Sequence, residues 1–305
     1  MAPSNAKPLT GPEMGLNFGL VGVSCVAAQS TVHWSQTTMV RQQLAAMSAA
    51  RAAASGAAAP APLGMFATTA QIFRAEGVGG LYRGFSAAAL RELSYSSLRF
   101  GLYEPLKLAL GADPRDRGAL ATAKKVLAGL GAGAFAAGVA SPTDLLTIRM
   151  MRDTSTPPLA LRACARAVLA EGGAAALYRG LDTTVTRAAI LGATKMATYD
   201  EVKSQLRERA GWRDGPAMVF VASVAAGLAI TITTSPATNA RTMIMAGEVP
   251  AGTGMLSAVK LILRNQGPVG LYRGFGMQWL RFGPYAVVQF AAWEYLRLLC
   301  GMGAL

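Results

Sequence analysis

Three arginines recur at one register of this sequence, and they are the residues best suited to bind an anion. Each lies seven residues after the glycine of a repeated Leu-Tyr-Arg-Gly phrase, and they are Arg91, Arg187 and Arg281. A guanidinium group binds a carboxylate or a phosphate through two parallel hydrogen bonds. Three of them at equivalent positions around a threefold axis would converge on one point. The sequence therefore predicts an anion-binding centre, with local pairing of each arginine as the alternative.

Further polar side chains follow the arginines at the spacing of one helix face. Positions i, i+4 and i+8 share a face of a helix. A charge inside an apolar helix is costly unless it faces a wet cavity or a partner. We therefore predict five more substrate-binding residues at these positions, namely Tyr95, Arg99, Lys195, Tyr285 and Gln289.

An acid and a base recur farther along the same segments. Thirteen residues past each arginine is an acid, and three residues later is a base: Glu104 with Lys107, Asp200 with Lys203, and Glu294 with Arg297. Between neighbouring segments these residues would form three ion pairs, and solvated pairs contribute only about 0–1 kcal/mol each. Such weak pairs could break and form again at little cost. The alternative is solvated pairing within one helix.

Long apolar segments must position these residues, and the segments recur in pairs. Crossing a bilayer takes roughly 20 residues, and six segments are long enough: residues 14–42, 84–109, 119–150, 181–209, 215–245 and 276–300. Between the members of each pair is an amphipathic stretch that ends at glycine, at 66–77, 160–172 and 256–267. The sequence thus predicts an all-α membrane protein with six transmembrane helices in three repeats, each with a short surface helix.

The repeated phrase also sets the boundaries of the repeats. Gly84 and Gly180 are 96 residues apart, and Gly180 and Gly274 are 94 residues apart. An Ala-rich stretch at about 47–64 reads as a flexible or partly helical insertion in the first repeat. We therefore divide the chain into repeats that together form one transmembrane domain, at 1–112, 113–210 and 211–305.

Composition separates a membrane protein from other classes. Of the 305 residues 52% are hydrophobic and only 15% are charged, with a net charge of +13, whereas a soluble domain carries about a quarter charged residues. No nucleic-acid-binding motif accompanies the positive charge. The single histidine, His33, and the three cysteines lack metal-ligand or disulfide spacing. With no nucleophile–base constellation and no phosphate-binding loop, we expect neither an enzyme nor a bound metal or cofactor.

Two recurring motifs together resemble the signature of the mitochondrial carrier family. The pattern P-x-D-x-x-(K/R)-x-(R/K) is similar to SPTDLLTIRM (141–150) and SPATNARTMI (235–244), and (D/E)-G-x4-(W/Y)-(K/R)-G is similar to EGVGGLYRG (76–84). The resemblance covers nearly the whole chain. It implies a threefold pseudosymmetric six-helix barrel in the mitochondrial inner membrane that alternates between a cytoplasmic-open and a matrix-open state. The acid and base positions described above then correspond to the cytoplasmic gate.

The resemblance also locates a matrix gate, whose charges are only partly preserved. The acid and base positions of its motif hold Gln36 and Met39, Asp144 and Thr147, and Thr238 and Arg241. One ion pair between spans remains, Asp144 with Arg241. Either an apolar plug closes the matrix side, or the cycle is lost and the chain is a carrier-like subunit or scaffold of a larger membrane complex.

The Tyr-Arg-Gly phrase begins the second span of each repeat, where free backbone N–H groups and the helix dipole favour an anion. A phospholipid phosphate is the expected guest, and the resemblance implies cardiolipin. A positively charged anchor at the membrane surface is the alternative. We assign lipid binding to the arginine and glycine of each phrase: Arg83, Gly84, Arg179, Gly180, Arg273 and Gly274.

The residues around the three arginines narrow the branch of the family. LRELSYSSLRFGLYEPLK (90–107) resembles the pattern RQ-x-x-Y-(S/T)-x-x-R-x-G-x-Y-(D/E) of dicarboxylate, oxoglutarate and uncoupling-type carriers. By that resemblance, the three arginines are the substrate contact points. Lys195 departs from the branch, which has Glu or Gln there, and adds a cation. We expect exchange of small anions, dicarboxylates or oxo-acids, with an uncoupling-type proton or fatty-acid carrier as the alternative.

Overall fold

Helices make up the regular structure of the described part of the chain. The structure, a computed structural model, describes residues 11–56, 63–111, 119–191, 194, 205, 216–250 and 252–300. Its helices are α1 (Gly11–Ala54), α2 (Met65–Leu81), α3 (Phe85–Ala109), α4 (Ala119–Arg152), α5 (Leu161–Ala176), α7 (Pro216–Met245), α8 (Met255–Gly270) and α9 (Phe275–Leu299). Residues 181–191 are helical as well. These elements agree with the predicted all-α class.

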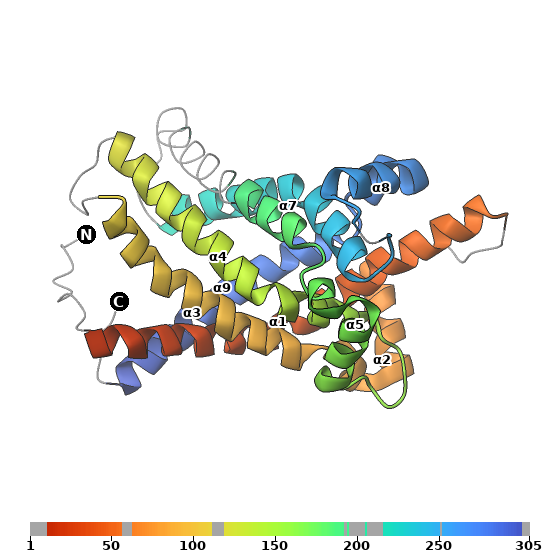
Figure 1. Cartoon of the computed structure of the whole chain (residues 1–305), viewed down its shortest axis with the longest axis horizontal. Helices are drawn as coiled ribbons and strands as arrows, with labels where there is room; N and C mark the ends of the chain where they lie inside the picture. The colour runs from red at the N-terminus through yellow and green to blue at the C-terminus, as the bar shows by residue number, and fades with distance from the viewer. Residues whose placement is uncertain are drawn as a thin grey trace.

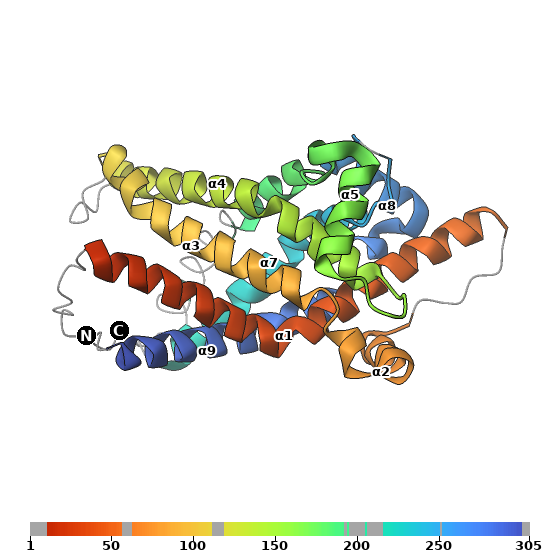
Figure 2. The same cartoon turned by 60° about the horizontal axis from the view of Figure 1, so that its bottom comes forward.

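The long helices pack around one another, and the short ones gather at one end. α1 packs against both α3 and α9, α3 packs against α4, and α7 packs against α9. Figures 1 and 2 place the start of α1 and the end of α9 at the same end of the molecule, with α2, α5 and α8 at the other. A chain that crosses the molecule an even number of times begins and ends at the same end, as expected for three repeats of two spans.

Five of the six predicted spans coincide with helices, namely α1, α3, α4, α7 and α9. The span predicted at 181–209 begins as a helix over 181–191, and most of its remainder lies outside the described residues. Among the described helices, one is long and apolar enough by composition alone to cross a membrane, within α4 at Ala123–Arg152. Other spans carry polar side chains such as Arg91 and Arg281, which lower their mean hydropathy and require an interior that receives them.

The repeated phrase needs glycine because the backbone there is left-handed and closely packed. Gly84, Gly180 and Gly274 have φ values of 77°, 85° and 78°, a region that residues with a Cβ rarely adopt. A Cβ on Gly84 would lie 2.9 Å from the carbonyl oxygen of Thr147, and a Cβ on Gly274 would lie 2.6 Å from Cγ of Met39. The phrase thus sets the second span of one repeat against the first span of the next.

The surface helices end at glycine, with one shift from the predicted position. Helical geometry breaks at Gly77 (φ 66°) inside α2 and at Gly267 (φ 67°) inside α8, which are the predicted final glycines. In α5 the left-handed residue is Gly173 (φ 64°), one residue after the predicted Gly172. A left-handed glycine is a common end of a helix because it lacks the Cβ penalty.

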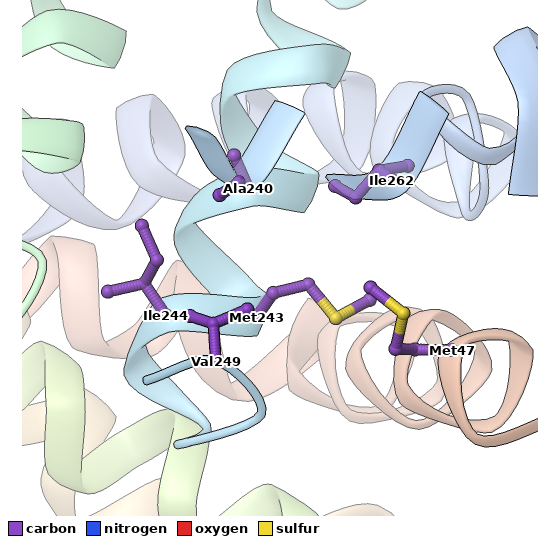
Figure 3. Close-up of a cluster of buried hydrophobic side chains, with 7 residues drawn as sticks. Met47, Ala240, Met243, Ile244, Val249 and Ile262 are labelled. Carbon is purple, nitrogen blue, oxygen red and sulfur yellow. The ribbon is translucent and has the colours of Figure 1, made fainter. Parts of the chain in front are cut away.

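The first helix continues into the Ala-rich stretch. Of the two predicted alternatives, flexible and partly helical, the structure has a helix as far as Ala54, and residues 57–62 lie outside the described part. Figure 3 shows Met47 of this extension pointing toward Met243 of α7, in a buried cluster with Ala240, Ile244, Val249 and Ile262. The extension therefore packs the first repeat against the third.

Candidate functional site

The three predicted arginines lie in one region of the protein interior. Arg91 is on α3, Arg281 is on α9, and Arg187 is on the helix over 181–191. The charge of Arg187 is repelled by those of Arg91 and Arg281, and Arg91 repels Arg281. Coulomb energy falls with distance, so this repulsion marks neighbouring groups. The fold therefore brings the three guanidinium groups to one region of the interior.

Each of these arginines contacts the same motif position of the next repeat. The pairs are Arg91 Nε with Asp144 Oδ1 at 2.6 Å, Arg187 Nε with Thr238 Oγ1 at 3.0 Å, and Arg281 Nη1 with Gln36 Oε1 at 3.2 Å. The three acceptors are the predicted acid positions of the matrix gate. The contacts therefore follow the threefold relation between the repeats.

Only one of the three acceptors is charged, so the arginines are unequally neutralised. Asp144 is shared, because its Oδ2 also lies 2.5 Å from Nη2 of Arg241, the matrix pair predicted from the sequence. Arg241 donates a second hydrogen bond, from Nε to the Thr184 hydroxyl at 2.9 Å. Among the described residues, by contrast, no carboxylate pairs with Arg187 or Arg281.

A buried carboxylate that the sequence analysis did not single out lies beside Arg91. Glu92 is 6% exposed, forms an ion pair with Arg91, and accepts a hydrogen bond from the Tyr285 hydroxyl of α9 at 3.2 Å. A signal for it existed, because the branch pattern has glutamine directly after the first arginine, where this chain has glutamate. Arg91 is therefore flanked by two carboxylates, Glu92 and Asp144.

The other predicted substrate-binding residues are brought to this region to different degrees. The guanidinium of Arg91 lies 5.1 Å from the ring centre of Tyr95, and that of Arg99 lies 6.0 Å from it. Arg99 is exposed and Gln289 is half-buried. Lys195 lies outside the described residues. Tyr95 is therefore positioned by two arginines, and it keeps its predicted place beside the first of the three contact arginines.

Two residues of the predicted matrix gate, Met39 and Thr147, have contacts with other parts of the protein and not with the three arginines. Met39 is buried, next to the backbone at Gly274. Thr147 is buried and donates to the carbonyl oxygen of its own helix at Thr143, at 2.7 Å. Packing at Met39 resembles the apolar plug expected from the sequence. The hydrogen bonds at Gln36 and Thr238, however, are polar contacts that this expectation did not include.

The predicted cytoplasmic gate is described only in part. Lys107 lies 5.5 Å from the ring centre of Tyr103, and Arg297 lies 5.6 Å from that of Trp293. Glu294 is exposed. Asp200, Lys203 and the side chain of Glu104 lie outside the described part. The three ion pairs expected there, Glu104–Lys203, Asp200–Arg297 and Glu294–Lys107, stay predictions.

The arginine of the first Tyr-Arg-Gly phrase is bound to carboxylates of the protein. Arg83 is 7% exposed and pairs with Glu76 at 2.6 Å and with Asp153 at 3.1 Å. A hydrogen bond from Arg41 lowers the pKa of Glu76 below its ordinary 4.5, although burial acts in the opposite direction. Glu76 thus stays ionised at neutral pH and links α1, α2 and the phrase.

Other polar side chains also hold the backbone around these phrases. His33 is fully buried, and its Nε2 lies 2.9 Å from the carbonyl oxygen of Arg83. Gln43 donates to the carbonyl oxygen of Arg273 at 3.2 Å, and Arg179 donates to that of Val249. The six predicted lipid-binding residues thus lie where the second spans begin, within a dense hydrogen-bond network.

Comparisons with known proteins fit this threefold arrangement. The model of a family described as mitochondrial carrier protein matches residues 12–113, 118–210 and 213–302. Mitochondrial uncoupling protein 4 of Arabidopsis thaliana is 35% identical over 75% of this chain and 74% of its own length. Mitochondrial citrate transporter F of Aspergillus niger is 32% identical over 79% and 81%, and dicarboxylate carrier UCP2 of Danio rerio is 30% identical over 77% and 76%. The chain therefore belongs to the mitochondrial carrier family, as a multi-pass transporter in the mitochondrial inner membrane and not an enzyme.

Proposed function

We propose that the carrier exchanges small dicarboxylates or oxo-acids at the site formed by Arg91, Arg187 and Arg281, where Arg187 and Arg281 bind the carboxylates and Arg91 is paired with protein carboxylates. A charge count in the described interior carries the proposal. Four guanidinium groups, those three and Arg241, face two carboxylates, Asp144 and Glu92, which leaves an excess of two positive charges. Burying uncompensated charge is costly. A substrate with two carboxylates would neutralise the excess.

Arg187 and Arg281 supply the two main binding groups in this proposal. Their partners among the described residues are the hydroxyl of Thr238 and the amide of Gln36, both neutral. A carboxylate neutralises the guanidinium charge and can accept two parallel hydrogen bonds from it, which a hydroxyl or an amide oxygen does not. A substrate carboxylate would therefore displace either partner. The names of the relatives, a dicarboxylate carrier and a citrate transporter among them, support carboxylates as the substrate class.

Substrate binding and opening of the matrix side are linked in this proposal, because the same arginines serve both. The contacts Arg187–Thr238 and Arg281–Gln36 join neighbouring repeats and have to break before the repeats separate. A carboxylate that takes over the arginine breaks such a contact and offsets its loss. We assign the remaining matrix gate to the pair Asp144–Arg241, and the cytoplasmic gate to the acid and base positions predicted from the sequence.

We also propose that a phospholipid, cardiolipin, binds where the second span of each repeat begins. The first N–H groups of a helix have no partner within it and favour a phosphate. Beside Gly84 is a cavity of about 200 Å³, with Tyr82 and Ser86 in its lining. Since Arg83 is paired with two carboxylates, we assign the phosphate contact there to backbone N–H groups rather than to the guanidinium.

Counter-exchange in liposomes tests the proposed transport. Purified carrier is placed in vesicles preloaded with malate, oxoglutarate, phosphate or ATP, and uptake of labelled malate is measured. We expect uptake with malate or oxoglutarate inside, and not with ATP. Proton conductance without exchange would favour the uncoupling-type alternative. Absence of any anion flux, together with stable co-purification with a larger complex, would favour a scaffold.

Removing one contact arginine tests the binding site itself. A charge-assisted hydrogen bond contributes about 1.5–3 kcal/mol, so Arg187→Ala should lower malate exchange about tenfold to a hundredfold. The matched control is Arg162→Ala, because Arg162 is an exposed arginine on α5, and its exchange rate should stay close to that of the wild type. Equal rates for Arg187→Ala and the control would remove Arg187 from the site.

A further inference from the structure

Glu92 occupies an unusual place for a carboxylate in an anion carrier. It is buried on α3, within the group of arginines proposed to bind the substrate. One carboxylate oxygen pairs with Arg91, and the other accepts the hydroxyl hydrogen of Tyr285 at 3.2 Å. Both oxygens are therefore held in place by neighbours from two helices. A buried acid in this position repels substrate carboxylates that approach Arg91, so its presence needs an explanation.

The charged neighbours of Glu92 come from several helices. From α3 it faces Arg91, and from α9 it faces Tyr285 and the charge of Arg281. From α1 it faces the buried Cys25 thiol. Asp144 of α4 lies on the other side of Arg91. Arg91 thus has a protein carboxylate on each side.

We propose that Glu92 is a built-in carboxylate that occupies the first contact arginine and thereby limits the carrier to substrates with two carboxylates. This inference rests on the proposed exchange of carboxylates. With Arg91 held by Glu92 and Asp144, the contact arginines without a described carboxylate partner are Arg187 and Arg281. These two arginines match in number the two carboxylates of malate or oxoglutarate.

A tricarboxylate such as citrate is excluded by the same arrangement. Its third carboxylate needs a third cation, and Arg91 is the remaining contact arginine among those described. To reach it, the third carboxylate would have to displace Glu92, which would stay in the same buried region as a second negative charge. Two like charges in a low dielectric repel strongly. Glu92 therefore acts as a filter against a third carboxylate.

Neutralising Glu92 without changing its shape tests the filter. Labelled malate and labelled citrate are compared as substrates of the full-length carrier in the same liposomes, for wild type and for Glu92→Gln. We expect the wild type to exchange malate and to exchange citrate poorly. The ratio of citrate to malate exchange should rise about tenfold in Glu92→Gln, since a charged hydrogen bond to Arg91 becomes available to the substrate.

Two further variants separate the effect of this charge from other effects. Glu92→Asp keeps the carboxylate and should keep the low citrate-to-malate ratio of the wild type. Asp182→Asn removes an exposed carboxylate at the start of the 181–191 helix, and should leave the ratio unchanged. If Glu92→Gln does not fold, Glu92→Ala carries the same test, because it also removes the carboxylate from beside Arg91. A purely structural role would change stability and total rate, and not the ratio.

The outcomes distinguish this inference from the proposed function. Malate exchange with an unchanged ratio in Glu92→Gln, or a wild type that exchanges citrate as fast as malate, would overturn the role of Glu92 and leave dicarboxylate exchange standing. No exchange of malate or oxoglutarate by the wild type would instead overturn the proposed function, and the role of Glu92 with it.

Discussion

At the scale of one residue, Thr238 stands at an acid position of the carrier motif, and its hydroxyl leaves the charge of Arg187 without a carboxylate partner among the described residues. An acid at this position would hold Arg187, as Asp144 holds Arg91 at 2.6 Å. The threonine hydroxyl accepts the Arg187 Nε at 3.0 Å without neutralising the guanidinium charge. In the proposed mechanism, the absence of an acid at this position therefore weakens the matrix gate and strengthens the substrate site.

Replacing that threonine by an acid should reverse the effect. In Thr238→Asp a protein carboxylate would compete with the substrate for Arg187. A charge-assisted hydrogen bond contributes about 1.5–3 kcal/mol, so we expect the KM for malate exchange to rise about tenfold or more. Thr238→Asn is the control, because asparagine has nearly the same shape as aspartate and carries no charge. Its KM should stay near that of the wild type. An identical KM for the two variants would contradict the charge count.

Single residues also mark the limit of prediction from the sequence. The register of Arg91, Arg187 and Arg281 follows from spacing alone, because an internal repeat places equivalent residues at equivalent sites. Apart from Glu92, the partners of these arginines come from other helices, so spacing within one segment does not give them. Glu92 differs from the branch pattern by one charge, yet its importance depends on burial and on Tyr285 of α9, which only the packed structure supplies.

At the scale of elements, the repeated glycines set how closely two helices approach. Gly84 has φ of 77°, and a Cβ there would meet the Thr147 carbonyl oxygen at 2.9 Å. A backbone oxygen within α4 cannot move aside as a flexible side chain does. Gly77 in the same segment has a similar φ of 66°, with nothing within 4 Å of a Cβ. A comparison of these two positions therefore separates the cost of the left-handed backbone from the cost of the close contact with α4.

Alanine at these two glycines should therefore have unequal effects. A left-handed conformation costs a residue with a Cβ about 1–2 kcal/mol, and both Gly77→Ala and Gly84→Ala incur that cost. Gly84→Ala adds the clash with α4, so its thermal unfolding midpoint in detergent should fall clearly further. Equal midpoints for the two variants would mean that α3 and α4 do not approach as closely as 2.9 Å implies.

At the scale of the whole molecule, ion pairs join the three repeats at the end that carries the surface helices. Glu248 pairs with Arg51 of α1 at 2.7 Å and with Arg152 of α4 at 2.9 Å, and so joins residues from all three predicted repeats. Arg83 of the first repeat pairs with Asp153 of the second at 3.1 Å. Opening of the matrix side has to break such pairs or carry them along with a moving repeat.

The repeat architecture was predictable because hydrophobic length and a repeated phrase are properties of the sequence itself. The extension of α1 was harder to predict. Alanine is a strong helix former, but the Ala-rich stretch lacks the apolar periodicity that marks a packed helix. Its one large buried side chain, Met47, packs on residues of α7 and α8 that are about 200 positions away. Such a contact is set by tertiary packing, and local pattern does not reveal it.

Met47 allows the role of this extension to be measured. It is fully buried between α1, α7 and α8, and Met→Ala in a core costs about 2–5 kcal/mol because a cavity remains. We therefore expect Met47→Ala to lower the thermal unfolding midpoint of the purified carrier. Leu256→Ala is the control, because Leu256 on α8 is 78% exposed and surface changes usually stay within about 0.5 kcal/mol. Similar midpoints for both variants would show that the extension does not pack on the third repeat. A lower midpoint for Met47→Ala alone would show that this chain uses an added helical segment, beyond the predicted span, to hold its first and third repeats together.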